Sequence, residues 1–175
     1  MPRVLPRPAI EELAQELLVS AGIKGPPVDL IRVAKHLGVR VQKTDLGPEC
    51  SGALARKDGS AVIGVHWLHH PNRQRFSIAH ELGHFKLHEG GTYVDKDIVV
   101  RFRDEKSGTG TDAEERQANQ FAATLLMPAD WVKVAFDSRA YAFGDGLALE
   151  ELAQLFQVST QAMSFRLADL GLLKL

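Results

Sequence analysis

Three histidines stand four residues apart in the stretch RFSIAHELGHFKLH, which runs from residue 75 to residue 88. Within it His80, Glu81 and His84 form the motif His-Glu-x-x-His, which places two imidazoles one above the other on a single helical face. Two such imidazoles can bind one metal ion at about 2 Å. A glutamate beside the first ligand can then take a proton from a water molecule at the ion. The motif predicts a hydrolytic metal site with His80 and His84 as ligands and Glu81 as general base.

The third histidine, His88, cannot bind the same ion from a straight helix. Eight residues separate it from His80, which corresponds to about 12 Å of helical rise, whereas every ligand must reach the ion at about 2 Å. The longer zincin motif brings a third histidine round six residues after the second, but here the spacing from His84 is four. We therefore expect His88 to cap the helix C-terminus, to support the ligands from behind, or to contact substrate.

A third ligand is expected from the helical segment AEERQANQFAATLLMP, which begins at residue 113. At 100° per residue Glu115 aligns with Asn119, and Glu114 aligns with Ala118, so both carboxylates flank the apolar stripe. A carboxylate that points inward is costly unless it meets a metal or a cation. The alternative is an exposed first turn, where the helix dipole favours acids. Periodicity leaves both Glu114 and Glu115 open as the ligand.

Helical and strand patterns mix along the chain in a way that predicts an α+β fold. Apolar residues at helical spacing predict helices over residues 10–18, over 28–38, from Pro71 or Asn72 through the histidines, and from 113 to Pro128 at the latest. Alternating patterns predict strands over residues 39–43, 51–57, 61–66 and 97–103, with an Asp-Gly turn between the second and the third. We expect these strands to form a small antiparallel sheet packed against the helices. The polar stretch from Lys106 to Thr111 is expected to be a surface linker.

The last section, residues 147–175, carries two helical patterns around Val158, with Ser159 or Thr160 capping the second. Such spacing is typical of a helix-turn-helix, with residues 160–169 in the recognition position. The section contains three acidic and two basic residues, which are too few cations for many phosphate contacts. A DNA-binding transcriptional regulator is therefore a less favoured hypothesis. A non-catalytic, metal-containing protein that binds a partner is a third.

Composition limits the class of protein. A chain of 175 residues that is 45% hydrophobic can bury a core and suits one compact domain with a small appendage. Its 21 basic and 22 acidic residues nearly cancel, so no strong field attracts nucleic acid or an anionic membrane. No apolar run approaches the roughly 18 residues of a membrane span, and Cys50, the single cysteine, cannot form an internal disulfide. These features favour a cytoplasmic protein without membrane contact.

Two blocks of the sequence resemble the ImmA/IrrE family of metallopeptidases. The first is R-F-S-I-A-H-E-L-G-H, residues 75–84, followed by His88; the second is E-R-Q-A-N-Q-F-A-A-T-L-L-M-P, residues 115–128. The segments PVDLIRVAKHLGVRV and AVIGVH also look like this family, so the resemblance covers most of the chain. Many members have glutamate where this sequence has Gln117, a departure that leaves the ligand position intact.

The resemblance implies a thermolysin-like zinc site of the gluzincin type, in which Glu115 joins His80 and His84 as the third metal ligand. It also implies a minimal metalloprotease domain over residues 1–137 and a helix-turn-helix-like segment over residues 138–175. Zn²⁺ fits this ligand set best, although Mn²⁺ or Fe²⁺ can use the same ligands. Further candidates for supporting the ligands, stabilising the oxyanion or contacting substrate are His88, Tyr93, Asn119, His66, His69 and His70.

The resemblance further implies a protein substrate. Relatives are paired with a repressor of the Xre helix-turn-helix type, often encoded nearby, which an endopeptidase would cleave to release stress, phage or mobile-element genes. Extended peptides bind zincins by adding to a sheet edge, and we expect residues 53–57 or 62–66 to offer that edge. Direct DNA binding is not expected.

Overall fold

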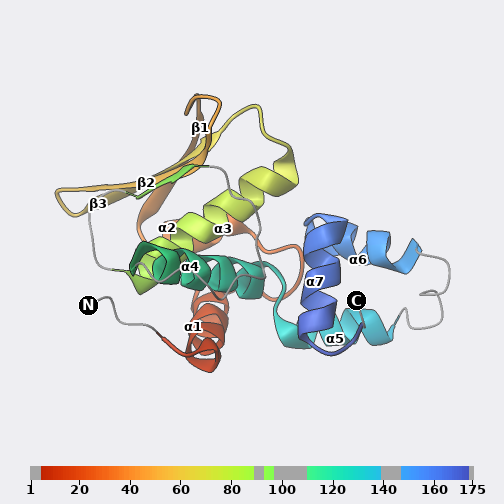
Figure 1. Cartoon of the computed structure of the whole chain (residues 1–175). Coiled ribbons are helices and arrows are strands. Elements are labelled where there is room, and N and C mark those ends of the chain that lie inside the picture. The colour runs from red at the N-terminus through yellow and green to blue at the C-terminus, as the bar shows by residue number, and fades with distance from the viewer. Residues whose placement is uncertain (1–4, 89–92, 97–109, 139–146, 174–175) are drawn as a thin grey trace.

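The structure is a computed structural model that describes residues 5–88, 93–96, 110–138 and 147–173. Its helices are α1 (Arg7–Ser20), α2 (Leu30–His36), α3 (Pro71–Leu87), α4 (Gly110–Leu126), α5 (Ala129–Asp137), α6 (Leu147–Phe156) and α7 (Thr160–Asp169). Its strands are β1 (Val39–Thr44), β2 (Cys50–Lys57), β3 (Ser60–His66) and β4 (Tyr93–Lys96). The sheet covers one side of α3, α4 and α1 follow on the other side, and α5 to α7 form a separate cluster at one end (Figure 1). The fold is of the α+β class, as predicted.

The sheet has the strand order β1-β3-β2-β4. β2 and β3 form the expected antiparallel hairpin through Asp58 and Gly59, whose φ angles of 49° and 76° suit a tight two-residue turn. β1, however, runs parallel to β3, so the prediction of an antiparallel sheet was wrong and the sheet is mixed. The reason is that β3, the second arm of the hairpin, inserts between β1 and β2.

This strand order also corrects the expected peptide-binding edge. The segment 62–66 lies in β3, which pairs with β1 on one side and β2 on the other. The segment 53–57 lies in β2, where Ala53 and Leu54 pair with β4 as well as with β3. Among the described strands, β1 and β4 are the edges instead. The sequence did not predict β4. The strand expected over residues 97–103 lies outside the described residues. So does the linker expected from Lys106 onwards, except for Gly110 and Thr111, which are the first two residues of α4.

α3 begins where the sequence predicted it. The Nδ1 atom of His70 accepts a hydrogen bond from the backbone N–H of Asn72 at 3.2 Å, and Pro71 occupies the first helical position, where its fixed φ favours the helix. The centre of α3, from Ser77 to His84, is buried without interruption because the sheet covers one side and α4 the other. The histidines of the motif are therefore inside the protein.

The C-terminal end of α3 is capped from the sheet. Arg56 of β2 donates hydrogen bonds from one nitrogen, Nη2, to the carbonyl oxygens of His84, Phe85 and His88, at 3.1, 2.8 and 3.0 Å. The last carbonyl groups of a helix run out of N–H partners along the same helix, and a cation at a helix C-terminus also interacts favourably with the helix dipole. The sequence predicted that His88 could cap the helix. In the structure its backbone N–H does so, by donating to the His84 carbonyl at 3.1 Å, whereas its side chain does not.

α3 and α4 approach closely at Gly83. A Cβ atom added to Gly83 would lie 3.0 Å from the Cα atom and 3.1 Å from the carbonyl oxygen of Ala118. Contacts this close are tighter than most that real Cβ atoms make, so any larger residue would push α3 and α4 apart by a few tenths of an ångström, and glycine avoids this. α4 ends at Leu126, before Pro128 as predicted, but it begins three residues earlier than the expected start at Ala113. The crossing brings the first half of α4 beside the histidines.

The C-terminal helices attach to this core through specific contacts. α6 and α7 occur where the sequence predicted helices, and Ser159 caps α7 by accepting the Ala162 N–H at 3.1 Å. α5 was not predicted. One cluster of buried apolar residues extends from Ile10 in α1 to Leu167 in α7. The division at residue 137 and the helix-turn-helix assignment stay predictions.

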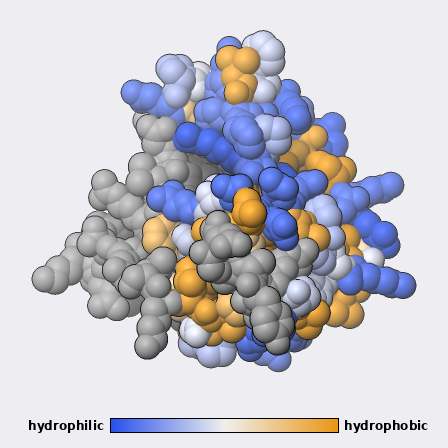
Figure 2. All heavy atoms as spheres, turned by 90° about the vertical axis from the view of Figure 1, so that its right-hand side faces the viewer, coloured by the Kyte–Doolittle hydropathy of each residue, from blue (hydrophilic) through white to orange (hydrophobic). Residues whose placement is uncertain are grey.

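The outer face of this C-terminal cluster is mixed in character. Apolar patches interrupt the polar surface on the side of the molecule where α5, α6 and α7 lie (Figure 2). Val134 of α5 is 72% exposed and Leu147 of α6 is 60% exposed. No helix in the described part of the chain is long and apolar enough to cross a membrane.

Candidate metal centre

Three electron-pair donors from two helices meet at one point. The Nε2 atoms of His80 and His84 lie 3.0 Å apart, and each lies 3.2 Å from an oxygen of the Glu115 carboxylate. Both imidazoles are 1% exposed, whereas the Glu115 side chain is 45% exposed and borders solvent. Glu114, the alternative that periodicity left open, is not part of this group.

Asn119 fixes the orientation of the His80 ring. Its side-chain oxygen Oδ1 lies 3.0 Å from His80 Nδ1 and can only accept, so His80 carries its proton on Nδ1. The Nε2 atom of His80 consequently has a free lone pair directed toward His84 and Glu115. Asn119 stands one turn after Glu115 on α4, so the same helix supplies one donor and orients another.

A chain of hydrogen bonds fixes His84 in the same way. The Gln117 amide nitrogen donates to the backbone carbonyl of Leu5 at 3.1 Å, so the Gln117 oxygen is left to face His88 Nε2 at 3.2 Å. That oxygen accepts, hence His88 donates from Nε2, and in a neutral imidazole its Nδ1 then accepts. Since His84 Nδ1 lies 3.1 Å from His88 Nδ1, His84 must donate there. Its Nε2 lone pair is therefore also free for a metal.

The charges of the group suit a cation. Burial lowers the pKa of His84, which keeps the imidazole neutral at neutral pH. Burial raises the pKa of the Glu115 carboxyl, whereas hydrogen bonds and positive charge from His80 and His84 protonated on Nε2 lower it, with a net lowering that leaves the carboxylate ionised; a metal ion would take the place of those protons. Two lone pairs and one negative charge thus converge, an arrangement that is repulsive unless a cation lies between them.

The spacing of the donors agrees with a tetrahedral metal site. Ligands held about 2.0–2.1 Å from a zinc ion at tetrahedral angles are separated by about 3.3 Å. The three separations of 3.0, 3.2 and 3.2 Å are close to this value. Nitrogen and carboxylate donors are also the ligands that zinc prefers, so the residues present fit the metal that the motif predicted.

Glu81 lies fully buried beside this group, on the side of the sheet. Its side chain is 0% exposed, and a Cβ atom added to Gly52 of β2 would lie 3.1 Å from Glu81 Oε1 and 3.3 Å from the Cβ atom of Ser77. The absence of a side chain at Gly52 therefore leaves the space that the Glu81 carboxylate occupies. Glu81 follows the first donor directly in sequence, which is the position that the motif predicts for a general base.

The other residues that the sequence suggested for supporting the ligands or contacting substrate lie in different parts of the fold. His88 and Asn119 contact the donors, as described above. Tyr93 lies in β4, in register with Leu54 of β2, and its side chain is outside the described part of the structure. His66 and His69 stack on each other with ring centroids 4.7 Å apart, and His70 caps the start of α3. His70 lies ten residues, or about 15 Å of helical rise, before His80.

Sequence reasoning missed several residues that shape the centre. Gln117 was noted only as a departure from the family pattern, and Leu5, Gly52, Gly83 and Arg56 were not singled out. Gly83 lies inside the motif itself, and a glycine in a helix interior is a signal of close packing because it weakens the helix otherwise. The other four act through contacts between distant segments and carry no local signal.

Comparison with known proteins places the chain among metallopeptidases by sequence. The family model described as an IrrE N-terminal-like domain matches residues 34–168. The radiation response metalloprotease IrrE of Deinococcus deserti is 37% identical over 123 residues, which cover 66% of this chain and 41% of that protein. The metallopeptidase ImmA of Bacillus subtilis is 27% identical over 133 residues, which cover 76% of this chain and 71% of that protein.

A solved structure shares the fold. A Mycobacterium tuberculosis transcriptional regulator superposes with a TM-score of 0.63 at 20% identity, over 91% of this chain and 46% of that one. The match shows the fold alone, and the chain spans less than half the length of the IrrE protein and of this regulator. The family match, in contrast, includes both blocks from which the resemblance was identified, residues 75–88 and 115–128. The chain belongs to the ImmA/IrrE family of metallopeptidases.

Proposed function

We propose that the protein is a zinc-dependent endopeptidase with a thermolysin-like site, in which His80, His84 and Glu115 bind the metal. One observation carries this proposal: three possible ligand atoms of His80, His84 and Glu115 lie 3.0 to 3.2 Å from one another, and the buried Glu81 follows the first of these residues in sequence. A structural zinc site needs no such carboxylate, because its four positions are closed by ligands. Membership of a metallopeptidase family supports the same reading.

The chemistry divides between the metal and the protein. A zinc ion at such a site polarises the scissile carbonyl and makes water more acidic. Glu81 takes the proton from the attacking water and later passes it to the leaving amine nitrogen. One side chain therefore acts first as the general base and then as the general acid. Asn119 and His88 keep the two imidazoles in the tautomers that leave Nε2 free.

The substrate is proposed to be an extended segment of a protein. β4 is an edge among the described strands and is the neighbour of β2, whose Gly52 lies against Glu81. A peptide that adds to this edge as a further strand would run close to the general base. We propose that the natural substrate is an Xre-type helix-turn-helix repressor encoded nearby, whose cleavage releases stress, phage or mobile-element genes.

The experiment compares the wild type with Glu81→Gln and His80→Ala. Each protein is purified, its bound zinc is quantified, and it is incubated with the repressor encoded beside its gene. We expect wild type and Glu81→Gln to bind one equivalent of zinc, and only the wild type to cut. His80→Ala should lose both properties, because it removes a ligand while Glu81 stays in place.

Other outcomes separate the alternatives. A wild type that binds no zinc overturns the proposal. If Glu81→Gln preserves the biological response in cells, the protein acts by holding its partner rather than by cleaving it. If the wild type binds duplex DNA in the absence of the repressor, and this binding weakens steeply as the salt concentration rises, the hypothesis of a DNA-binding regulator is favoured, because phosphate contacts depend on salt in this way.

A further inference from the structure

Helices α6 and α7, with the turn at residues 157–159 between them, form one unit, the α6–α7 pair, which is joined to the first turn of α3. The side-chain amide of Asn72 donates to the Val158 carbonyl at 2.9 Å. Arg75 donates from Nε to the Gln157 carbonyl at 3.3 Å. The helix that carries the two histidine donors is therefore attached at its start to a turn from the last section of the chain.

The turn that receives these two hydrogen bonds is fixed by its own backbone. α6 ends in a Schellman motif, in which the Gln157 N–H donates to the Gln154 carbonyl at 3.1 Å. The Val158 N–H donates to the Ala153 carbonyl at 3.0 Å. Gln157 accordingly has a φ angle of 53°, and Ser159 caps the helix that follows. The two carbonyl groups that face α3 are thus held in fixed directions.

The α6–α7 pair also holds the end of α4. Arg166 of α7 is 4% exposed and donates from Nε at 3.0 Å to the carbonyl of Met127, the residue directly after α4. Pro128 follows and has no N–H to offer the last turn of α4. A cation at this end of a helix also interacts favourably with the helix dipole. Arg166 therefore caps α4 much as Arg56 caps α3.

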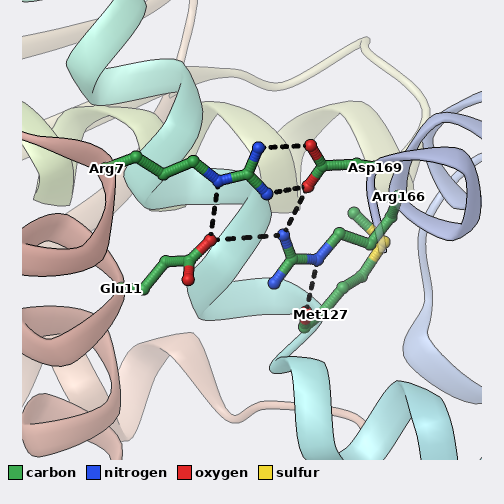
Figure 3. A network of polar contacts seen from close by, with 5 residues as sticks. All are labelled: Arg7, Glu11, Met127, Arg166 and Asp169. Atoms are coloured by element: carbon green, nitrogen blue, oxygen red, sulfur yellow. Dashed lines mark hydrogen bonds and ion pairs between the residues drawn. The ribbon is translucent and has the colours of Figure 1, made fainter. Parts of the chain in front are cut away.

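A network of ion pairs keeps Arg166 in this position (Figure 3). Its Nη1 lies 3.0 Å from Asp169 Oδ2 and 3.9 Å from Glu11 Oε1. Arg7 of α1 binds the same two carboxylates, Asp169 through both terminal nitrogens and Glu11 through Nε at 2.9 Å. Two cations balance two anions, so the buried charge is compensated. Arg166, the one basic residue of α7, is directed into the protein rather than toward a phosphate.

The two attachments lie far from the donors but on the same helices. Asn72 is eight residues before His80, which corresponds to about 12 Å of helical rise. Met127 is twelve residues after Glu115, or about 18 Å. A helix moves as a rigid rod over such lengths, so a shift of α3 against α4 at this end displaces the donors as well. The donor atoms are only 3.0 to 3.2 Å apart, so a small displacement alters the geometry offered to a metal.

We propose that the α6–α7 pair is a clamp that sets the position of α3 relative to α4. Asn72 and Arg166 are its two contact points and act as positioning residues of the metal centre. This inference rests on the proposed function only in taking the two histidines and Glu115 as zinc ligands. It does not depend on which protein is cleaved.

The test measures zinc affinity in the full chain by competition with a chelating dye, so it needs no substrate. Asn72→Asp preserves the shape of the side chain and places an acid where the helix dipole favours one, but a carboxylate cannot donate to the Val158 carbonyl. The new negative charge attracts a cation, so a loss of affinity cannot be due to charge. We expect zinc to bind about tenfold more weakly, at the lower end of what residues behind metal ligands contribute.

A clamp makes a particular prediction for a double variant. Arg166→Met removes the bond to Met127 and should weaken zinc binding by a similar factor. A clamp that is released at one end no longer holds the other. Asn72→Asp combined with Arg166→Met should therefore bind zinc about as well as the weaker single variant does. If the two factors multiply to about a hundredfold, the contacts act independently and the clamp is overturned.

Gly38→Ala is the control for a general loss of stability. Gly38 has a φ angle of 72°, where alanine is strained, and an added Cβ atom meets nothing within 4 Å. We expect a lower melting temperature and zinc affinity equal to that of the wild type. An equal loss of affinity in Gly38→Ala and Asn72→Asp would assign the effect to stability and overturn the proposal. If Arg166→Met does not fold, this comparison decides alone.

The outcomes also separate this inference from the proposed function. Zinc binding by the wild type and by Asn72→Asp with equal affinity overturns the clamp and leaves the peptidase proposal in place. A wild type that binds zinc but cuts no repressor contradicts the proposed substrate, whereas the affinity comparison still decides on the clamp. A wild type without zinc overturns both.

Discussion

The Nδ1 atoms of His84 and His88 lie 3.1 Å apart, and this contact shows that His88 supports His84 rather than joining the group of donors itself. His88 does not face the point where the donors converge; its Nδ1 accepts a hydrogen bond from Nδ1 of His84, on the far side of that ring. The chain of hydrogen bonds continues through Gln117 to the backbone of Leu5. Gln117, a residue outside the motif, and the carbonyl of Leu5 before α1 thus decide which nitrogen of His84 carries its proton.

Removing His88 should weaken the metal site without removing a ligand. Partners behind a metal-binding histidine are typically worth a factor of about 10–100 in metal affinity. We expect the zinc affinity of His88→Ala to be lower than that of the wild type by a factor in this range, as measured by competition with a chelating dye. His36→Ala, which alters an exposed histidine at the end of α2, is the matched control. Equal affinities of the two variants would contradict the role given to His88.

Two substitutions of Gln117 should separate its two hydrogen bonds. Gln117→Glu keeps an oxygen for His88 but loses the donor to Leu5, whereas Gln117→Leu loses both. We expect zinc affinity close to wild type for the first and reduced for the second. Hydrogen exchange should show faster opening around residue 5 in both variants. If both lose zinc equally, the acceptor oxygen is not what orients His88.

Gly83→Ala should force α3 and α4 apart. The new methyl group would lie 3.0 Å from the Cα atom of Ala118, a backbone atom that cannot move aside alone. Overpacking of this kind costs about 1–3 kcal/mol of unfolding free energy. Because Glu115 lies on α4, zinc affinity should fall as well. Gly25→Ala, where an added Cβ meets nothing within 4 Å, is the control in thermal unfolding.

Gly52→Ala should affect the chemical step more than the metal. Its added Cβ would lie 3.1 Å from Glu81 Oε1 and displace that carboxylate, and the three atoms nearest to it belong to Glu81 and Ser77 rather than to a donor of the metal group. Displacing a reacting group by about 1 Å can cost up to about a hundredfold in rate. We expect zinc content to stay at the wild-type level and kcat for repressor cleavage to fall. Loss of zinc together with activity would show that Gly52 supports the ligands instead.

Arg56→Met should destabilise the end of α3. The substitution keeps an apolar stem but leaves the carbonyls of His84, Phe85 and His88 without their charged donor. Hydrogen bonds to charged groups contribute about 1.5–3 kcal/mol. We expect a decrease in unfolding free energy of that order, measured by denaturant titration of the zinc-loaded protein. Arg40→Met on β1, at an exposed position, should change stability little.

Local signals predicted the parts of the structure that local chemistry determines. Pro71 and Pro128 delimit the two helices of the site, and the Asp58-Gly59 turn fixes the β2–β3 hairpin. The pair of histidines followed from helical spacing alone. Periodicity could not choose between Glu114 and Glu115, because both flank the apolar stripe; the family resemblance favoured Glu115, and the structure places Glu115 beside the histidines.

The features that were missed depend on contacts between distant segments. The direction of β1 depends on where the hairpin inserts, which no alternation of residues along β1 reveals. β4 has four residues and α5 has nine, both too short for a clear periodic pattern. Gln117 reaches His88 across 29 residues and Leu5 across 112, separations at which a single sequence carries no pairing signal.

The ion pairs between Arg7 and Asp169 join residues that are 162 positions apart. A ribosome adds about 5–20 residues per second, so the first partner waits on the order of 10–30 s for the second to be made. Arg166, which shares Asp169 with Arg7, lies three residues before Asp169 and is likewise synthesised long after Arg7. During translation the donors of α3 and α4 can already meet, while the contact between α1 and α7 closes only after α7 has been synthesised. Assembly of the metal centre and closure of the α1–α7 junction are thus separated in time.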